Sequence, residues 1–222
     1  MAERIAPDAP VLVIGLGRFG AGTAGQLQRL DREVLATDID MDLVQKWSER
    51  ITHAVQADST KLEALQQIGA ADFQIAVVAI GDVEASVLTV ANLVDLEIPQ
   101  IWAKAVSASH GKILSRIGAN HVIYPEREAG ERVAHLVSGR MLDFIEFDDG
   151  YAIVKMYPPK AIRGVPLSES GVRSRWHVTV VGVKSPGEGF THATAETVIS
   201  DHDLIIVSGL ASDIERFATL AT

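Results

Sequence analysis

The chain contains no cysteine among its 222 residues, so disulfide bonds and thiolate metal sites are excluded. It also has no dense run of lysines and arginines. Its 29 acidic side chains outnumber the 20 basic ones, for a formal net charge of −9. Nucleic-acid binding needs a basic face that displaces counterions from phosphates, and anionic lipid repels an acidic surface. We therefore expect no nucleic-acid partner and no direct insertion into lipid.

Long apolar runs are also missing. Residues 1–7 contain no apolar signal core, and the apolar run at residues 75–80 is far shorter than the ~20 residues that span a bilayer. The sequence therefore predicts a cytoplasmic protein.

Arrangements typical of catalysis are scarce. The seven histidines are scattered without a pairing pattern, and we expect most of them at the surface. A dehydrogenase needs an acid, a base or a carbonyl-polarising residue beside the nicotinamide. We therefore expect no enzymatic activity, and an NAD-dependent oxidoreductase is the alternative.

Over the first 125 residues, apolar runs alternate with amphipathic stretches. A continuous apolar run such as Val11–Ile14 is typical of a strand buried on both faces. We expect strands at 11–14, 33–37, 53–55, 73–80, 100–103 and 121–124, with helices at 19–30, 41–49, 61–68, 84–96 and 109–117. This alternation predicts an α/β fold, a Rossmann-like doubly wound parallel sheet.

The residues after this pattern predict a long helix and then a second module. A helix is expected at 126–140, with Ala129, Val133, Leu136 and Val137 in one apolar stripe that packs either on its own domain or on a partner. Turn signals then separate strands at 145–147, 151–157, 178–184 and 204–207, followed by a helix at 212–220. The predicted layout is a nucleotide-binding domain at 9–125, a crossover helix at 126–140 and a small α+β lobe at 141–222.

The loop after the first predicted strand reads Gly15-x-Gly17-x-x-Gly20 and contains Phe19. In such a loop the first glycine permits a tight turn, the second lets phosphate approach the backbone, and the third lets helix pack on strand. The N–H groups at the start of the next helix favour the anion. The loop therefore predicts an adenine-nucleotide site, and a purely structural glycine turn is the alternative.

Two charged residues refine this prediction. Arg18 directs a cation at the phosphates, which favours ATP or ADP over NAD, unless its side chain points to solvent. Asp38 ends the second predicted strand, where a carboxylate can accept the ribose hydroxyls and would repel the 2′-phosphate of NADP. Alternatively, Asp38 or Asp40 caps the following helix.

Further candidates lie at the ends of neighbouring strands. Ile39 follows Asp38, and Asp58 and Ser59 follow the third strand at the rim where the adenine would lie. The turn after the third strand can also start a helix, with Ser59 or Thr60 as its cap. After the fourth strand, Ile80-Gly81 offers another close approach of the backbone.

Taken together, these motifs resemble the RCK domain of the KtrA/TrkA family of bacterial potassium-transport regulators. The resemblance rests on Val13–Gly20, Thr37–Asp40, Ala57–Thr60 and Asn120–Glu126. The tail is similar to the TrkA-C type C-terminal lobe of that family at Gly164–Leu167, Val172-Arg173, Val178–Lys184 and Asp203–Gly209. The resemblance covers nearly the whole chain. Within the family, Arg18 together with Pro125-Glu126 is most similar to the Ktr branch.

The resemblance implies a regulator in which ATP and ADP compete for one site. It implies dimers that assemble into an octameric ring beneath an integral membrane potassium-transport subunit of the KtrB/TrkH type, at the inner face of the membrane. The crossover helix would then pack on a neighbour. An NAD(H)-binding regulator of the TrkA type is the alternative.

The resemblance also implies roles for individual residues. Arg18 would contact the terminal phosphates, Asp38 the ribose and Asp58 the adenine region. Lys104 would lie near the phosphates, and Glu126 would approach a γ-phosphate or a bound metal cation across the dimer.

For the C-terminal lobe the resemblance implies a cyclic di-AMP site between two subunits, with Arg173 and Arg175 as candidates for the phosphates. The alternative is that both arginines are solvated. The chain departs from the family here, because residues 190–194 contain no proline and Gly171 occupies a place where the family favours a polar residue.

Overall fold

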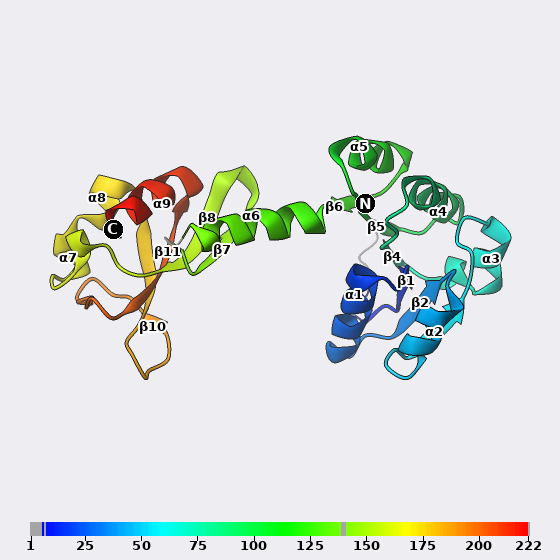
Figure 1. Cartoon of the computed structure of the whole chain (residues 1–222), viewed down its shortest axis with the longest axis horizontal. Coiled ribbons are helices and arrows are strands. Elements are labelled where there is room, and N and C mark those ends of the chain that lie inside the picture. The colour runs from blue at the N-terminus through cyan, green and yellow to red at the C-terminus, as the bar shows by residue number, and fades with distance from the viewer. Residues whose placement is uncertain (1–5, 7, 139–140, 222) are drawn as a thin grey trace. The chain divides into compact units, whose positions relative to one another are not determined.

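The structure, a computed structural model, describes residues 6, 8–138 and 141–221 (Figure 1). Most of the N-terminal segment 1–7 and the last two residues of the predicted helix 126–140 therefore lie outside the described residues. The chain divides into two compact units, the first ending at Glu126 and the second beginning at Arg127. In the described part of the chain, no helix has the length and apolarity needed to cross a membrane.

The first unit contains a six-stranded parallel sheet in the order β3-β2-β1-β4-β5-β6. This is the doubly wound order, and it confirms the predicted fold class. The strands are β1 (Val11–Ile14), β2 (Val34–Asp38), β3 (His53–Gln56), β4 (Ile75–Val78), β5 (Gln100–Lys104) and β6 (His121–Ile123).

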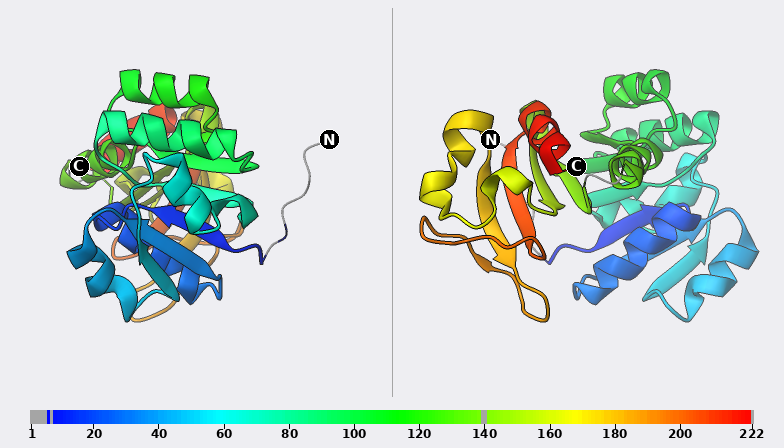
Figure 2. Two further views of the ribbon diagram at one scale, coloured as in Figure 1. Left: turned by 90° about the vertical axis from the view of Figure 1, so that its right-hand side faces the viewer. Right: turned by 60° about the vertical axis from the view of Figure 1, so that its left-hand side comes forward.

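Helices cover both faces of this sheet (Figure 2). Val11 and Val13 of β1 pack toward α1 and α2, whereas Leu12 and Ile14 pack toward the other helices. Because alternate residues of β1 face two separate cores, its apolar run is continuous. The helices are α1 (Arg18–Arg29), α2 (Met41–Ser48), α3 (Leu62–Gln67), α4 (Val83–Asp95) and α5 (Ala108–Ile117), with a short 3₁₀ turn at Ala70–Asp72.

The second unit contains a five-stranded antiparallel sheet, in the order β10-β9-β11-β8-β7, with helices α7, α8 and α9, and most of α6 also belongs to it. Ala152, Val154 and Met156 of β8 are buried in its core. The predicted α+β class is confirmed, but the helix pair α7–α8 and the two-residue strand β10 were not predicted. The elements are β7 (Asp143–Glu146), β8 (Tyr151–Met156), α7 (Leu167–Ser170), α8 (Val172–Trp176), β9 (Thr179–Lys184), β10 (Thr191–His192), β11 (Leu204–Leu210) and α9 (Ala211–Ala218), with 3₁₀ turns at Asp148–Gly150, Lys160–Ile162 and Thr219–Ala221.

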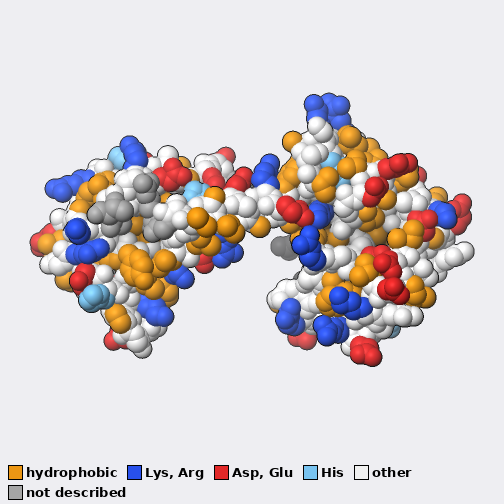
Figure 3. Space-filling model, viewed as in Figure 1, with side chains coloured by type: hydrophobic (Ala, Val, Ile, Leu, Met, Phe, Trp, Pro, Cys, Tyr) orange, Lys and Arg blue, Asp and Glu red, His pale blue; other side chains and the backbone are white. Residues whose placement is uncertain are grey.

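Helix α6 (Pro125–Val137) begins in the first unit and continues into the second. None of its residues is buried, and 55% of Val133 and 80% of Val137 is exposed. Apolar side chains are visible along it in the space-filling view (Figure 3). Its predicted apolar stripe is therefore largely open to solvent within this chain.

His110, at the start of α5, is an exception to the expectation of surface histidines, since only 1% of it is exposed. Its Nδ1 accepts a hydrogen bond from the backbone N–H of Val106 at 3.3 Å. Burial lowers the pKa of His110 below the ordinary value of 6.5, because the charged ring loses hydration. The folded protein therefore holds this ring neutral.

We expect His110 to make the free energy of unfolding depend on pH. A pKa lowered in the folded state means that the unfolded chain binds the proton first, so stability is full above about pH 6.5 and falls as the pH drops below it. His110→Asn keeps an acceptor for Val106 and should lose this component of the pH dependence. Urea unfolding between pH 5 and pH 8 measures it, and parallel profiles for both proteins would contradict the assignment.

Candidate nucleotide-binding site

The carboxyl ends of the parallel strands meet at one edge of the first unit, and the glycine loop lies there. Backbone hydrogen bonds tie the loop to its neighbours: the Gly15 N–H donates to Thr37 O and the Ala79 N–H to Ile14 O, both at 2.7 Å. The strand order reverses between β2 and β4, on either side of β1. Ligands of open α/β sheets bind at such a reversal.

Two of the three glycines of the loop are required by the fold itself, and the remaining one, Gly17, faces open space. Gly15 has a φ of +98°, which side chains rarely adopt, and a Cβ there would lie 3.1 Å from the Ala79 carbonyl. A Cβ on Gly20 would lie 1.8 Å from Gly15 O, so only glycine fits. A Cβ on Gly17 would meet nothing within 4 Å. Nothing within the protein requires a glycine at residue 17. The open space there suits the close approach of an external group.

Asp38 holds the loop from the end of β2. Its Oδ2 accepts from the Leu16 N–H at 2.6 Å and its Oδ1 from the Asp40 N–H at 2.9 Å. Each carboxylate oxygen retains a further lone pair, so both can also accept from ribose hydroxyls. Asp40, rather than Asp38, caps α2 by accepting from the Asp42 N–H.

A cavity of about 350 Å³ lies beside Asp38, where the adenine was expected. Hydrogen bonds from the Thr60 hydroxyl and from Lys61 hold the pKa of Asp58 below its ordinary value, although burial opposes the shift. The carboxylate is therefore ionised, and it remains an acceptor at the cavity wall. The cavity is lined by Ile39, Gln56, Ala57, Asp58, Lys61, Ala64, Gln67 and Ile68.

Ser59 does not line this cavity. Its hydroxyl is buried and lies 2.8 Å from Thr89 Oγ1 on α4, so it contributes to packing. The expected capping of α3 by Ser59 or Thr60 is wrong. The Thr60 hydroxyl donates to Asp58 Oδ1 at 2.6 Å. Lys61 stands at the cap position, and its side chain pairs with Asp58 and makes no capping hydrogen bond.

Charged side chains from three elements lie at the carboxyl edge of the sheet. Lys104 ends β5, and its Nζ lies 2.6 Å from Oε1 of Glu126 at the start of α6. The hydrogen bond from Lys104 is the main cause that lowers the pKa of Glu126, and the charge of Arg18 at the start of α1 adds to it. Glu126 therefore pairs with a cation of its own chain, Lys104.

No three His, Asp or Glu side chains gather into a metal site in the parts of the chain that the structure describes. Glu126 would therefore hold a cation only together with oxygens from another source, such as phosphate. Ile80 and Gly81 follow β4, and a Cβ on Gly81 would meet nothing within 4 Å.

Most residues that line the cavity beside Asp38 were not predicted from the sequence, and Gln56 and Lys61 are the polar ones at the end of β3. Gln56 and Lys61 line the cavity at the end of β3, and the Gln56 amide donates to Ile39 O at 2.9 Å. The end of β3 at the carboxyl edge was the available signal, because ligands of open α/β sheets bind outside the carboxyl ends of the strands.

The spacing Tyr-x-x-x-Lys occurs at Tyr151 and Lys155, but both residues belong to strand β8 of the second unit. This spacing brings two side chains together only on a helix. In a strand, four residues extend roughly 13 Å. The pair therefore does not form an acid–base couple.

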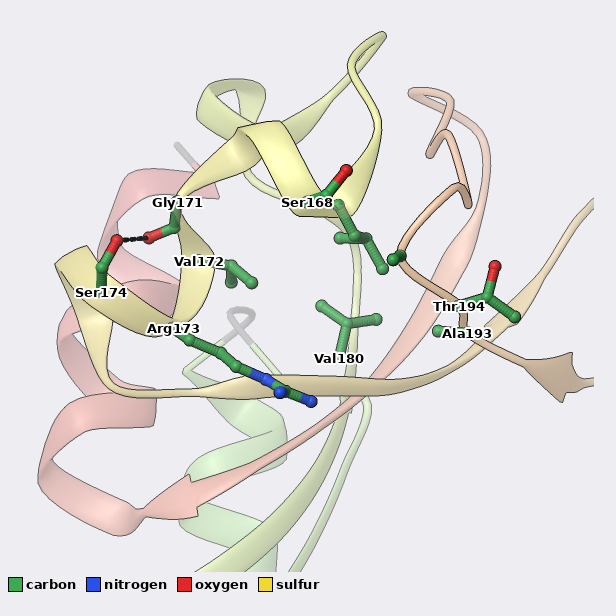
Figure 4. A pocket seen from close by; sticks show the side chains of 10 residues that line it. Ser168, Gly171, Val172, Arg173, Ser174, Val180, Ala193 and Thr194 are labelled. Atoms are coloured by element: carbon green, nitrogen blue, oxygen red, sulfur yellow. Dashed lines mark hydrogen bonds between the residues drawn. The ribbon is translucent and has the colours of Figure 1, made fainter.

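The second unit contains a cavity of about 310 Å³ between the α7–α8 segment and β9 (Figure 4). Arg173 lines it, together with Val172, Val180 and Thr194. Arg175 does not line it, and its Nε lies 3.2 Å from the place of a Cβ on Gly171. Both arginines that the sequence grouped lie in α8, but only Arg173 of the two lines the cavity.

Comparison with known proteins agrees with this geometry. The TrkA-N domain family matches residues 11–125, and the TrkA-C domain family matches residues 151–222. Ktr system potassium uptake protein A of Bacillus subtilis is 35% identical over 92% of this chain and 93% of its own length. Ktr system potassium uptake protein C of the same organism is 37% identical over 92% and 94%.

Solved structures show the same fold. The RCK domain of GsuK superposes with a TM-score of 0.66 at 18% identity, over 98% of this chain and 49% of that chain. GsuK has also been solved bound to NAD (TM-score 0.55, 19% identity, 99% and 39% covered) and bound to ADP (0.52, 21%, 60% and 35%). This chain spans half or less of each GsuK chain.

The sheet order and the glycine loop define a Rossmann-type α/β domain, joined to a small antiparallel lobe, and the whole has the fold of the GsuK RCK domain. Within that class, the chain belongs to the Ktr/TrkA family of potassium uptake proteins.

We expect Gly17 and Gly20 to respond differently to alanine. Gly20→Ala forces a methyl group into the Gly15 carbonyl and should cost about 3 kcal/mol or more of unfolding free energy. Gly17→Ala should cost about 1 kcal/mol or less, as a cap residue. Its methyl group should nevertheless weaken ADP binding at least tenfold.

Gly22→Ala, in the interior of α1, is the matched control. A Cβ there meets nothing within 4 Å, so the variant should gain roughly 0.5–1 kcal/mol from helix propensity and keep its ADP affinity. Urea unfolding and calorimetric titration measure both quantities. Equal ADP affinity in Gly17→Ala and the wild type would contradict the assignment of Gly17.

Proposed function

We propose that this chain is a nucleotide-sensing regulatory subunit of a potassium uptake system, without catalytic activity. One observation carries the proposal: a glycine loop opens onto the uncapped start of α1, with Arg18 and Lys104 at the same edge. The N–H groups and the two cations form an anion site. The names of the Bacillus relatives supply the physiological context, potassium uptake.

The ligand that fits this site best is ATP or ADP. Asp38 would accept the ribose hydroxyls, Ile39 and Asp58 would flank the adenine in the 350 Å³ cavity, and Gly17 would face the phosphates. Two cations suit a terminal polyphosphate better than the bridging pyrophosphate of NAD. A cation held by γ-phosphate oxygens and Glu126 would complete an ATP complex.

The proposed output is a change in the shape of a homo-oligomer. The exposed apolar stripe of α6 supports its role as a crossover helix that packs on a neighbouring copy. We propose dimers assembled into an octameric ring at the inner face of the membrane, on an integral membrane subunit of the KtrB/TrkH type. ATP and ADP can shift such a ring only if each binds its two shapes with different affinities.

The domain layout we propose follows the same logic. Residues 9–125 bind the nucleotide, 126–140 form the crossover and 141–222 form the C-terminal lobe. The exposed face of α6 is the feature that favours a separate crossover segment.

A second ligand is supported by the cavity in the C-terminal lobe. Arg173 along a half-apolar cavity of about 310 Å³ is suited to an anionic cyclic dinucleotide such as cyclic di-AMP. The packing of Arg175 against Gly171 leaves Arg173 as the candidate phosphate ligand.

Arg18→Ala should weaken ATP binding more than NAD binding. One charged contact to a terminal phosphate contributes on the order of 1–3 kcal/mol, which NAD cannot use in the same way. Calorimetric titration of both ligands measures the difference, with Arg29→Ala at the opposite end of α1 as the control. Equal losses would contradict the role of Arg18. Tight NADH binding with no ATP binding would instead support an NAD(H)-binding regulator, and hydride transfer would support an oxidoreductase.

Arg173→Ala should weaken cyclic di-AMP binding at least tenfold, because the arginine lines the cavity. Arg175→Ala, two residues away on the same short helix, should leave the affinity within about twofold. Titration of the full chain measures both, and a loss of the same size in the two variants would refute the site.

A further inference from the structure

Lys104 ends β5 at the same carboxyl edge of the sheet as the glycine loop, and a carboxylate of its own chain is bound to it. Its Nζ is 2.6 Å from Glu126 Oε1, and only 12% of the lysine side chain is exposed. A largely buried ammonium group needs an anionic partner, because an unpaired charge loses hydration without compensation. In this structure Glu126 supplies that charge.

Glu126 is well placed to remain an anion. It is the second residue of α6, where the N–H groups of the first turn favour negative charge. The hydrogen bond from Lys104 lowers its pKa first, and the charge of Arg18 lowers it further. The carboxylate thus already occupies Lys104, a cation that a polyphosphate would use.

We propose that Glu126 is a built-in competitor of the nucleotide phosphate for Lys104: where no cation bridges the two anions, phosphate displaces the Glu126 carboxylate and releases the first turn of α6. The inference rests on the proposed function, since it requires phosphate at the glycine loop. A phosphate that contacts the Lys104 ammonium would also lie close to the Glu126 carboxylate, which contacts the same ammonium. Two anions that share one cation in this way repel each other. With 65% of its side chain exposed, Glu126 can move into solvent while Lys104 stays in place.

The consequence lies in the helix that Glu126 begins. Helix α6 starts at Pro125 in the first unit and runs to Val137 in the second, so a change at its first turn acts on the segment that joins them. The signal is the charge of the phosphate and not the adenine base. Adenosine, which fills the base and ribose positions alone, would leave the Lys104–Glu126 pair intact.

The test is calorimetric titration of the full chain with ADP and with adenosine, in EDTA so that no divalent cation bridges phosphate and carboxylate. Glu126→Gln removes the competing charge and should bind ADP about three- to tenfold more tightly than the wild type. Adenosine affinity should not change. A merely structural role for Glu126 would alter both ligands together.

Glu131→Gln is the matched control. Glu131 lies on the same helix with 61% of its side chain exposed and pairs with Arg127 at 3.8 Å, away from Lys104. The substitution removes the same charge and should leave ADP affinity unchanged. Equal tightening in both variants would reduce the effect to net charge and overturn the proposal.

Other outcomes distinguish a failure of the Glu126 competition from a failure of the proposed nucleotide-sensing function. If the wild type binds ADP and Glu126→Gln binds it equally or more weakly in EDTA, the competition is refuted while the nucleotide site stands. If the wild type binds no adenine nucleotide, both are refuted. Should Glu126→Gln not fold, Glu126→Asp shortens the carboxylate by one methylene, and ADP should then bind more tightly by a smaller factor.

Discussion

The first turn of α1 packs so closely on the loop before it that Gly20 has no room for a side chain. A Cβ there would lie 1.8 Å from the Gly15 carbonyl oxygen. This contact directs the start of α1 at the carboxyl edge of the sheet, and its uncapped N–H groups lie there. Asp38 holds the same loop through the Leu16 N–H. The proposed anion site depends on these two contacts. The Gly20 contact holds α1 against the loop, and Asp38 holds the loop against the end of β2.

Charge balance at this edge links the site to the rest of the chain. Lys104 and Arg18 provide positive charge, and Glu126 offsets part of it from the first turn of α6. The proposed function has phosphate bind these cations, and such binding must rearrange the carboxylate that already pairs with Lys104. A regulatory subunit of potassium uptake needs such coupling, and membership in the Ktr/TrkA family agrees with it.

Much of the fold could be predicted because its signals are local. Continuous apolar runs marked the central strands, since residues such as Leu12 and Val13 face two cores. The short helices α7 and α8 could not be predicted, because four or five residues show no helical period. His110 was missed for a related reason: burial depends on what packs over a residue, and no pattern within α5 records it.

The sequence by itself determined the glycine loop, Asp38 at the end of β2 and the family to which the chain belongs. These features depend on residue type and on short spacings along the chain. A tight turn or the end of a strand is formed by neighbouring residues, so the sequence alone shows it. Only the tertiary structure decided that Lys104 pairs with Glu126 and that Ser59 faces the core. It also decided that Arg173, and not Arg175, lines the cavity between the α7–α8 segment and β9. Each of these outcomes depends on which side chains the sheet brings together from separate elements, and sequence distance does not encode that.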